Sequence, residues 1–380
     1  MRILFVTHTV AMAGANSSML RLILELRENY QVEPVVLMPH VHPAYAKRNL
    51  LKSCLEHHIE CYSYRFYWFK ERRTWKSYLK CFSNALWYPR ILWALRSQQF
   101  DIIHSNGSVI SLGALISRSK RVPHVWHLRE FGNLDFNLHS LLGPLYEKWV
   151  YRHADAYIAI SEIIKSHFAA LIPPEKIRTI YNGVAVPETM REEKHNKTDV
   201  QLCMLGLVSE SKNQKEALRA VDLLVHREGV RHFHLSFVGH EEYPYIDELR
   251  TFVATHGLGD YVTFMGERSN VDELLNTMNI GLMLSQSEAF GRVTVEYMMH
   301  EMAVIASDTG ANREIVVDGV TGCIYPLGNV EALTARMKQL IADHALIGNY
   351  GTAGKKRALS LFTSERNTFE VYQVYSCLTC

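Results

Sequence analysis

The sequence predicts an α/β fold built from two doubly wound, Rossmann-like domains. Short apolar runs alternate with segments of helical periodicity along all 380 residues, a length that allows two or three domains. The polar, aperiodic stretch 187–198 interrupts this alternation near the middle of the chain. The charge also changes sign there, because residues 1–185 contain 23 Lys and Arg against 13 Asp and Glu, whereas residues 186–380 contain 18 against 26. We therefore expect one domain over 1–186 and a second over 187–363, with different partners.

In the first half, apolar runs indicate buried strands, and apolar residues that recur every three or four positions indicate helices. The predicted strands are 2–7, 33–38, 101–104, 122–131 with its exit loop, 156–160 and 177–180. The predicted helices are 17–29, 45–57, 108–117, 141–153 and 162–171. We expect residues 2–7 to form a buried strand and not part of a signal peptide, because their apolar core of four residues is shorter than such a leader requires.

The second half restarts the same alternation after the linker. Its predicted strands are 201–207, 234–238, 262–264, 280–284 and 303–307. Its predicted helices are 216–228, 246–256, 271–278, 293–299, 330–343, 351–361 and 364–375. The sequence has no apolar run of 18 residues, so no transmembrane helix is predicted.

The stretch 285–319 carries the clearest functional pattern. Glu288 and Glu296 flank the loop 289–292, which follows a predicted strand and leads into a predicted helix. Backbone N–H groups and the helix dipole at such a helix N-terminus attract phosphate, and Gly291 allows a ligand to approach the backbone closely. Two glutamates at this spacing are ordinarily just solvated side chains, but a nucleotide sugar would occupy both the N–H groups and the carboxylates.

This stretch resembles the retaining glycosyltransferases of family 4, which have the GT-B fold. The resemblance is carried by both glutamates, by Phe290-Gly291 between them, and by the following sequence VIASDTGANREIVVDGVTG. It implies two domains facing across a cleft, with the acceptor bound by 1–186, the nucleotide sugar bound by 187–363, and a C-terminal helix 364–380 packed back on the first domain. It also implies a nucleoside-diphosphate sugar as co-substrate and no further cofactor.

The same resemblance assigns residues to the donor. Glu288 would hold hydroxyl groups of the sugar, Glu296 the ribose, and Lys212 the diphosphate. Where the family commonly has an arginine after a glycine, this chain has Leu207, and we expect Arg292 to take over part of that role. The full set expected to bind the donor is Gly14, Gly206, Lys212, Gly266, Arg268, Glu288, Phe290, Gly291, Arg292, Val293 and Glu296. For Gly14, an ordinary turn stays an open alternative.

His127 follows an apolar strand, where similar enzymes keep a cleft histidine that hydrogen-bonds the donor sugar. A histidine at the end of a strand is often only structural, so both interpretations stay open. Arg129 and Glu130 are expected to face the acceptor. The expected catalytic residues are Glu288, His127 and Lys212.

The chain contains no D-x-D motif, so a metal-bound diphosphate site of the usual kind is not expected. The resemblance implies metal-independent transfer of a hexose-type sugar with retention of configuration. The acceptor would be a saccharide or a lipid-linked saccharide, in the synthesis of bacterial surface polysaccharide. Two alternatives are a GT-B nucleotide-sugar epimerase and a catalytically silent, membrane-bound scaffold that binds sugar nucleotides.

Residues 62–96 contain 12 aromatic residues and 8 Lys or Arg against the single acid Glu71. This composition suits the headgroup region of an anionic membrane, and we expect a peripheral membrane contact there. The alternatives are a pair of helices with an aromatic core, or a nucleic-acid surface, although no nucleic-acid motif accompanies it.

Seven cysteines favour free thiols in a reducing compartment. Neither the terminal Cys377-Leu378-Thr379-Cys380 nor the cluster at 54–61 is expected to bind metal. We therefore expect a cytoplasmic protein at the inner face of the plasma membrane.

Overall fold

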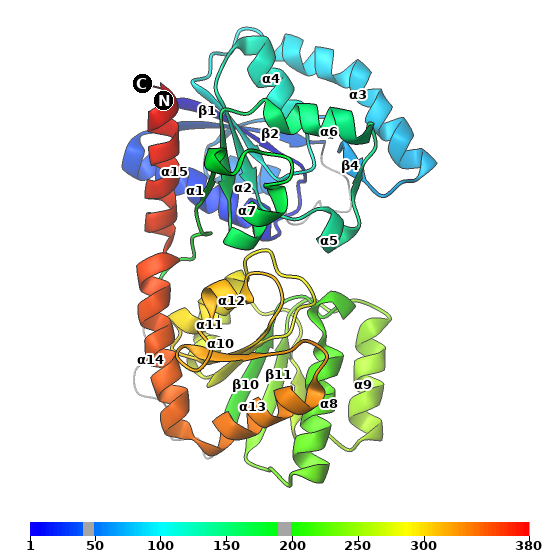
Figure 1. The fold of residues 1–380 in the computed structure, drawn as a ribbon, viewed down its shortest axis with the longest axis vertical. Helices are drawn as coiled ribbons and strands as arrows, with labels where there is room; N and C mark the ends of the chain where they lie inside the picture. Colours follow the sequence, from blue (N-terminus) through cyan, green and yellow to red (C-terminus); the bar gives the residue numbers. More distant parts are fainter. Residues whose placement is uncertain (41–48, 189–198, 380) are drawn as a thin grey trace. The chain divides into compact units, whose positions relative to one another are not determined.

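The computed structural model describes residues 1–40, 49–188 and 199–379, and divides the chain into two compact units. Unit 1 comprises Met1–Gly183 and the C-terminal segment that begins at Ser364, and unit 2 comprises Val184–Thr363 (Figure 1). From residue 189 to 198, the predicted linker lies outside the described residues, as does the start, 45–48, of the predicted helix 45–57.

Unit 1 contains a wholly parallel sheet with the strand order β3-β2-β1-β5-β6-β8-β9. Its strands are β1 Arg2–Thr7, β2 Glu33–Pro39, β3 Glu60–Tyr64, β5 Ile102–Asn106, β6 His124–Leu128, β8 Ala156–Ala159 and β9 Ile177–Thr179. Ile3 and Phe5 of β1 belong to one apolar cluster, and Leu4 and Val6 belong to another. Because alternate side chains of a strand point to opposite faces, both faces of this sheet are buried, as in doubly wound domains.

The helices of unit 1 cover these two faces. They are α1 Gly14–Tyr30, α2 Leu50–Glu56, α3 Trp75–Ala94, α4 Leu112–Lys120, α5 Asn133–Phe136, α6 Gly143–Arg152, α7 Glu162–Phe168 and α15 Ser364–Thr379. The last helix packs on α1, where Tyr372 stacks on Tyr30 with ring centroids 4.2 Å apart and Thr368 donates to Glu25 (2.7 Å). The C-terminal segment is therefore part of the core of unit 1.

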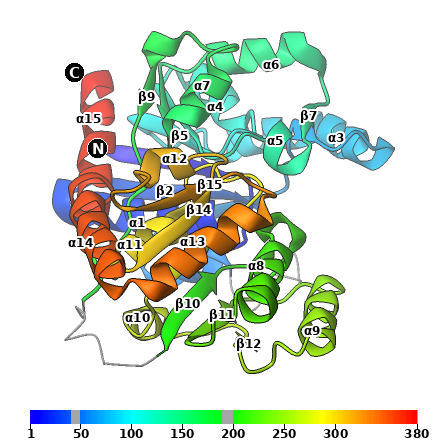
Figure 2. The same cartoon turned by 60° about the horizontal axis from the view of Figure 1, so that its bottom comes forward.

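Unit 2 repeats this architecture with the parallel strand order β12-β11-β10-β13-β14-β15. Its strands are β10 Val200–Leu205, β11 Phe233–Val238, β12 Val262–Phe264, β13 Ile280–Met283, β14 Ala303–Ser307 and β15 Gly322–Tyr325. Its helices are α8 Gln214–Asp222, α9 Tyr245–Thr255, α10 Val271–Asn276, α11 Arg292–Met299, α12 Asn312–Ile315, α13 Val330–Ala342 and α14 His344–Leu361, and α8 and α13 pack together beside the sheet (Figure 2). Two doubly wound α/β domains are thus confirmed.

The structure differs from the sequence predictions at β15, at α14 and within residues 62–96, among other places. Strand β15 was not predicted, because its apolar run is only three residues long and is buried by its pairing with β14. Helix α14 begins seven residues before 351, where the Asp343 side chain accepts a hydrogen bond from the Leu346 N–H (2.9 Å) and caps it. The pair of helices considered for 62–96 is a single helix, α3, preceded by the end of β3 and by the short strand β4 (Lys70–Glu71), which pairs with β7 (His139–Ser140).

None of the helices in the described residues is long and apolar enough to cross a membrane.

Candidate functional site

The strand order of unit 2 reverses direction between β10 and β13, which lie side by side. In parallel sheets of this kind, ligands bind beyond the carboxyl ends of the strands at such a reversal. Lys212 follows β10 and Glu288 follows β13, and the Lys212 Nζ donates to Glu288 Oε2 over 2.8 Å. The Lys212 side chain is 33% exposed and that of Glu288 is 17% exposed, so both are accessible at this edge.

The loop after β13 holds Glu288 at several points. Its other carboxylate oxygen accepts the Gly291 N–H (3.1 Å), and its backbone carbonyl accepts the Ala311 N–H (2.8 Å). Gly291 has a φ of +80°, a conformation that glycine adopts without strain. Gly310 has a φ of +56°, and a Cβ there would lie 2.1 Å from the Glu288 carbonyl oxygen. A side chain at either position would therefore disturb the carboxylate.

Three strand-exit loops are tied together around this pair. The Ser285 carbonyl accepts hydrogen bonds from the hydroxyls of Ser307 (3.0 Å), the last residue of β14, and of Thr309 (2.7 Å), two residues later. The Gln286 N–H donates to the Ser211 carbonyl (3.0 Å), which connects the loop after β13 to the loop after β10. These hydrogen bonds hold together the loops that carry Lys212 and Glu288, two residues that are 76 positions apart in sequence.

Helix α11 contains Arg292 and Glu296, the other two charged candidates of the stretch 285–319. Arg292 is its first residue, and its guanidinium lies 3.5 Å from Glu296 Oε1 one turn later. Both side chains are about one quarter exposed. Phe290 is 2% exposed and its ring packs edge-on against Phe362, 5.8 Å away. Any contact of Phe290 with a ligand would therefore use its backbone, and the neighbouring Val293 is half-buried.

Glycines follow the neighbouring strands at the same edge of the sheet. Gly206, Gly239 and Gly266 follow β10, β11 and β12, and have φ angles of +135°, +147° and +64°. A Cβ on Gly239 would lie 1.8 Å from the Gly206 carbonyl oxygen, whereas a Cβ on Gly206 would meet nothing within 4 Å. Arg268 is exposed beyond Gly266, and Leu207 is 36% exposed. The roles expected for Gly206, Gly266 and Arg268 stay predictions.

In unit 1, His127 lies near the carboxyl end of β6 and is fully buried. The Arg129 guanidinium donates to His127 Nδ1 (3.3 Å) and to the Asn182 side chain (2.6 Å), and also bonds Asn106. A guanidinium has only donors, so Nδ1 of a neutral His127 must accept and its proton must lie on Nε2. Nε2 has no hydrogen-bond partner among the described residues. His127 therefore has one N–H available for an additional acceptor.

Three buried histidines lie around this point. His104 contacts His127 edge-on (ring centroids 5.3 Å apart), and its Nδ1 lies 2.7 Å from the Tyr375 hydroxyl of α15. Burial, with the nearby Arg129 charge, lowers the pKa of both His104 and His127 well below 6.5, and burial lowers the pKa of His124 to about 3. All three imidazoles are neutral in the folded protein at neutral pH.

Arg129 and Glu130, like His127, are almost fully buried. Arg129 is 6% exposed and Glu130 is 8% exposed. The Glu130 carboxylate accepts the Ser108 N–H (2.5 Å) and the Ser108 hydroxyl (2.9 Å). Their expected role toward an acceptor stays a prediction, and these bonds favour a supporting one, in which Arg129 orients His127.

Gly14 is the first residue of α1, is exposed, and leaves open space where a Cβ would be. The loop before it is held by Asn16, whose amide donates to the carbonyls of Thr9 (2.8 Å) and Ala11 (2.9 Å). Asn16 and Gly310 are two residues that the sequence reasoning missed. The only sequence signal for Gly310 is a glycine soon after the strand that precedes it.

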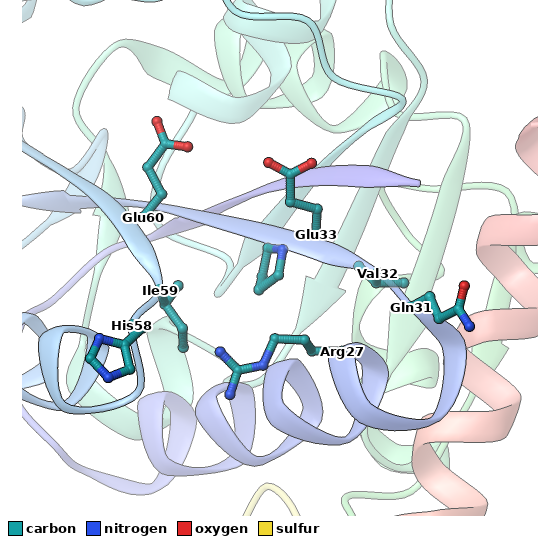
Figure 3. A pocket seen from close by; sticks show the side chains of 8 residues that line it. Arg27, Gln31, Val32, Glu33, His58, Ile59 and Glu60 are labelled. Atoms are coloured by element: carbon teal, nitrogen blue, oxygen red, sulfur yellow. The ribbon is translucent and has the colours of Figure 1, made fainter.

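A hollow of about 410 Å³ lies elsewhere on unit 1, at the amino ends of β2 and β3 (Figure 3). Glu33 and Glu60 line it, and both carboxylates pair with Arg2, at 2.9 and 2.5 Å. It lies at the opposite edge of the sheet from His127, and both of its carboxylates already pair with Arg2. Among the described residues, no group of three or more His, Cys, Asp or Glu could hold a metal ion.

Two family models match the chain. The one described as "Glycosyltransferase Family 4" matches residues 12–186, and the one described as "Glycosyl transferases group 1" matches residues 186–357. Together they span residues 12–357, which leaves out β1, the end of α14 and α15.

Individual proteins are also similar. The lipopolysaccharide core biosynthesis mannosyltransferase LpcC of Rhizobium leguminosarum bv. viciae is 27% identical over 293 residues (70% of this chain, 82% of that protein). The putative glycosyltransferase EpsD of Bacillus subtilis (strain 168) is 27% identical over 317 residues (77% and 81%). The crystal structure of Anabaena Alr3699/HepE in complex with UDP superposes with a TM-score of 0.81 at 19% identity, covering 99% of this chain and 100% of that one. HepE has also been solved with UDP-glucose.

Proposed function

The chain belongs to the family 4 type of glycosyltransferases, with the GT-B fold, and we propose that it transfers a hexose-type sugar with retention of configuration. The donor would be a nucleoside-diphosphate sugar bound by unit 2, and the acceptor a saccharide or lipid-linked saccharide. HepE binds UDP and UDP-glucose, which favours a nucleotide-sugar donor for this chain as well.

The observation that carries the proposal is the Lys212–Glu288 ion pair at the point where the strand order reverses. A nucleotide sugar offers a better partner to each member, because its diphosphate is anionic and its hydroxyls are donors. Lys212 would turn to the diphosphate, while Glu288 would accept hydrogen bonds from the sugar. Glu296, one turn into α11, would accept hydrogen bonds from the ribose.

The chemistry would take place at the anomeric carbon. Its bond to the diphosphate oxygen breaks, and a bond to the acceptor hydroxyl forms on the same face of the sugar. The proton of that hydroxyl passes to the departing phosphate oxygen, so neither glutamate has to form a covalent bond. Lys212, Arg292 and the N–H groups at the start of α11 would stabilise the diphosphate charge without a metal ion, which is electrostatic catalysis by fixed donors.

The name of one relative supports a proposal for the pathway. LpcC is named for lipopolysaccharide core biosynthesis, so we propose synthesis of a bacterial surface polysaccharide at the inner face of the plasma membrane. Residues 62–96 would make a peripheral contact with that membrane, since they combine aromatic and basic side chains.

His127 would donate its Nε2 proton to a hydroxyl of the donor sugar, with Arg129 keeping that tautomer.

Incubation with UDP-, GDP- and dTDP-hexoses is expected to release the nucleoside diphosphate slowly from one class of donor, even without acceptor. The release should persist in EDTA, because the charge on the leaving group would be stabilised by protein groups. Product analysis by NMR should show transfer with the anomeric configuration of the donor. Release of a rearranged free sugar would instead favour an epimerase, and no release from any donor would favour a silent scaffold.

Arg292→Ala is expected to raise the KM for the donor roughly tenfold or more, since a hydrogen bond to a charged group is worth about 1.5–3 kcal/mol. The reason is the position of Arg292 at the first residue of α11, beside the expected diphosphate. Arg313→Ala is the matched control, because Arg313 is 64% exposed and pairs only loosely with Asp308 (3.6 Å) in the same unit. Unchanged donor affinity and turnover in Arg292→Ala would contradict the assignment.

A further inference from the structure

Helix α3 presents a row of large apolar side chains to solvent. Trp75, Leu79, Phe82, Leu86 and Trp93 are 69%, 59%, 61%, 65% and 66% exposed. They stand at positions i, i+4, i+7, i+11 and i+18, which places all five on one face of an α-helix. We call these five residues the α3 stripe. Single exposed apolar residues are ordinary, but a continuous stripe marks a contact surface.

The opposite face of α3 is anchored in unit 1. Ile91 is buried in the apolar cluster that covers one face of the sheet. The Asn84 side chain exchanges two hydrogen bonds with the Tyr67 backbone, each 2.9 Å long. Thr74 caps the helix by accepting the Ser77 N–H (3.2 Å). Because the helix is held on this side, the stripe on its other side is exposed to solvent. Helix α3 itself lies at the periphery of unit 1 (Figures 1 and 2).

The structure separates the aromatic residues of 62–96 into two groups. Phe66 and Phe69 are 3% and 1% exposed, and the Trp68 indole donates to the His8 carbonyl (2.7 Å), so the first part of the segment is core. The exposed apolar surface lies in α3 alone. The core interpretation and the surface interpretation of the sequence therefore each apply to a different part of the segment.

The charges around the stripe select its partner. Exposed basic residues flank it in sequence and on the helix, and α3 itself contains no acidic residue; they are Arg72, Arg73, Lys76, Lys80, Arg90 and Arg96. The Arg96 guanidinium lies 3.9 Å from the centre of the Trp93 ring, so this basic group rests on the stripe itself. A second copy of the same face would bring like charges together, whereas anionic lipid headgroups would neutralise them.

We propose that α3 lies flat on an anionic membrane, with the α3 stripe inserted at the boundary between headgroups and acyl chains. The basic residues then lie at the level of the lipid phosphates, and Trp75 and Trp93 occupy the interface that tryptophan prefers. This inference narrows the proposed membrane contact to one helix face, and it does not depend on glycosyl transfer. An acceptor carried by a lipid would be met at the same surface.

The test uses the full-length protein and vesicles of phosphatidylcholine with 30% phosphatidylglycerol (about one third anionic). Sedimentation should recover the protein with these vesicles at low salt, and much less with phosphatidylcholine alone or at high salt. Phe82→Ser/Leu86→Ser should weaken binding at least tenfold. Lys76→Gln/Lys80→Gln should weaken it by about fivefold for each lysine, and only on anionic vesicles.

Phe369→Ser is the matched control, because Phe369 is an apolar side chain of unit 1 that is 49% exposed but lies on α15. Brominated lipids should quench the wild-type tryptophan fluorescence, and Trp75→Phe/Trp93→Phe should remove that quenching. Equal binding by the stripe variant and the control would overturn the proposal. So would a stripe-dependent dimer in sedimentation that forms without lipid. Since no donor is present, failure here leaves glycosyl transfer standing, and failure of the donor screen leaves α3 standing.

Discussion

Glu288→Gln is expected to lower kcat/KM for sugar transfer by at least two orders of magnitude. Glutamine keeps the volume of the side chain and can still accept the Gly291 N–H, so the loop after β13 should keep its shape. It loses the negative charge that pairs with Lys212 and that would accept hydrogen bonds from the sugar hydroxyls. Loss of one fixed electrostatic contact in an active site costs about 10²–10³ in rate. Steady-state kinetics with the donor found in the screen would measure it.

Glu301→Gln provides a closely matched control. Glu301 pairs with Lys355 over 2.8 Å, the same length as the Lys212–Glu288 pair, but it lies beyond the other end of α11. It should change activity less than twofold. Near wild-type transfer by Glu288→Gln, with Glu301→Gln equally active, would count heavily against the site at the β10–β13 reversal.

Unit 1 is expected to lose much of its stability between pH 7 and pH 5. His104, His124 and His127 are neutral in the folded state because burial lowers the pKa of each below 6.5, whereas each would bind a proton near pH 6.5 in the unfolded chain. Below pH 6.5 the unfolded state therefore takes up more protons, and stability falls as the pH falls. Each histidine should cost about 2 kcal/mol at pH 5, and the three together about 6 kcal/mol. That is comparable with the whole stability of a domain.

Tryptophan fluorescence measures this loss for unit 1 alone, since all six tryptophans lie before residue 150. Urea titrations at several pH values would give the slope of the free energy of unfolding against pH. That slope is proportional to the number of protons taken up on unfolding, and His124→Gln should lower this number by about one, whatever it does to the absolute stability. His153→Gln, at an exposed position, should leave the slope unchanged. A free energy of unfolding that stays constant down to pH 5 would contradict the neutral, buried state of these histidines.

Much of the fold follows from local patterns. Strands such as β1, β12 and β14 have the predicted bounds. For β1 and β14 the reason is plain, because each is a short apolar run and both of its faces are buried. The pattern in the stretch 285–319 is equally local, since Glu288, Gly291 and Glu296 lie within one loop and the first turns of one helix. Spacing and residue type alone would have left the two glutamates as ordinary solvated side chains, and the resemblance of the stretch 285–319 to family 4 glycosyltransferases assigned them a role.

Other features depended on partners that are distant in the sequence. Glu288 pairs with Lys212, 76 positions away, and Arg129 bonds Asn182. Gly310, in the next strand-exit loop, lies so close to the Glu288 backbone that a Cβ would not fit between them. The burial of Arg129 and Glu130, and the division of 62–96 into a core part and an exposed helix face, have the same origin. Periodicity along a chain shows which side chains share a face, but only the packing of the sheet and helices decides which face is covered and which carboxylate meets which cation.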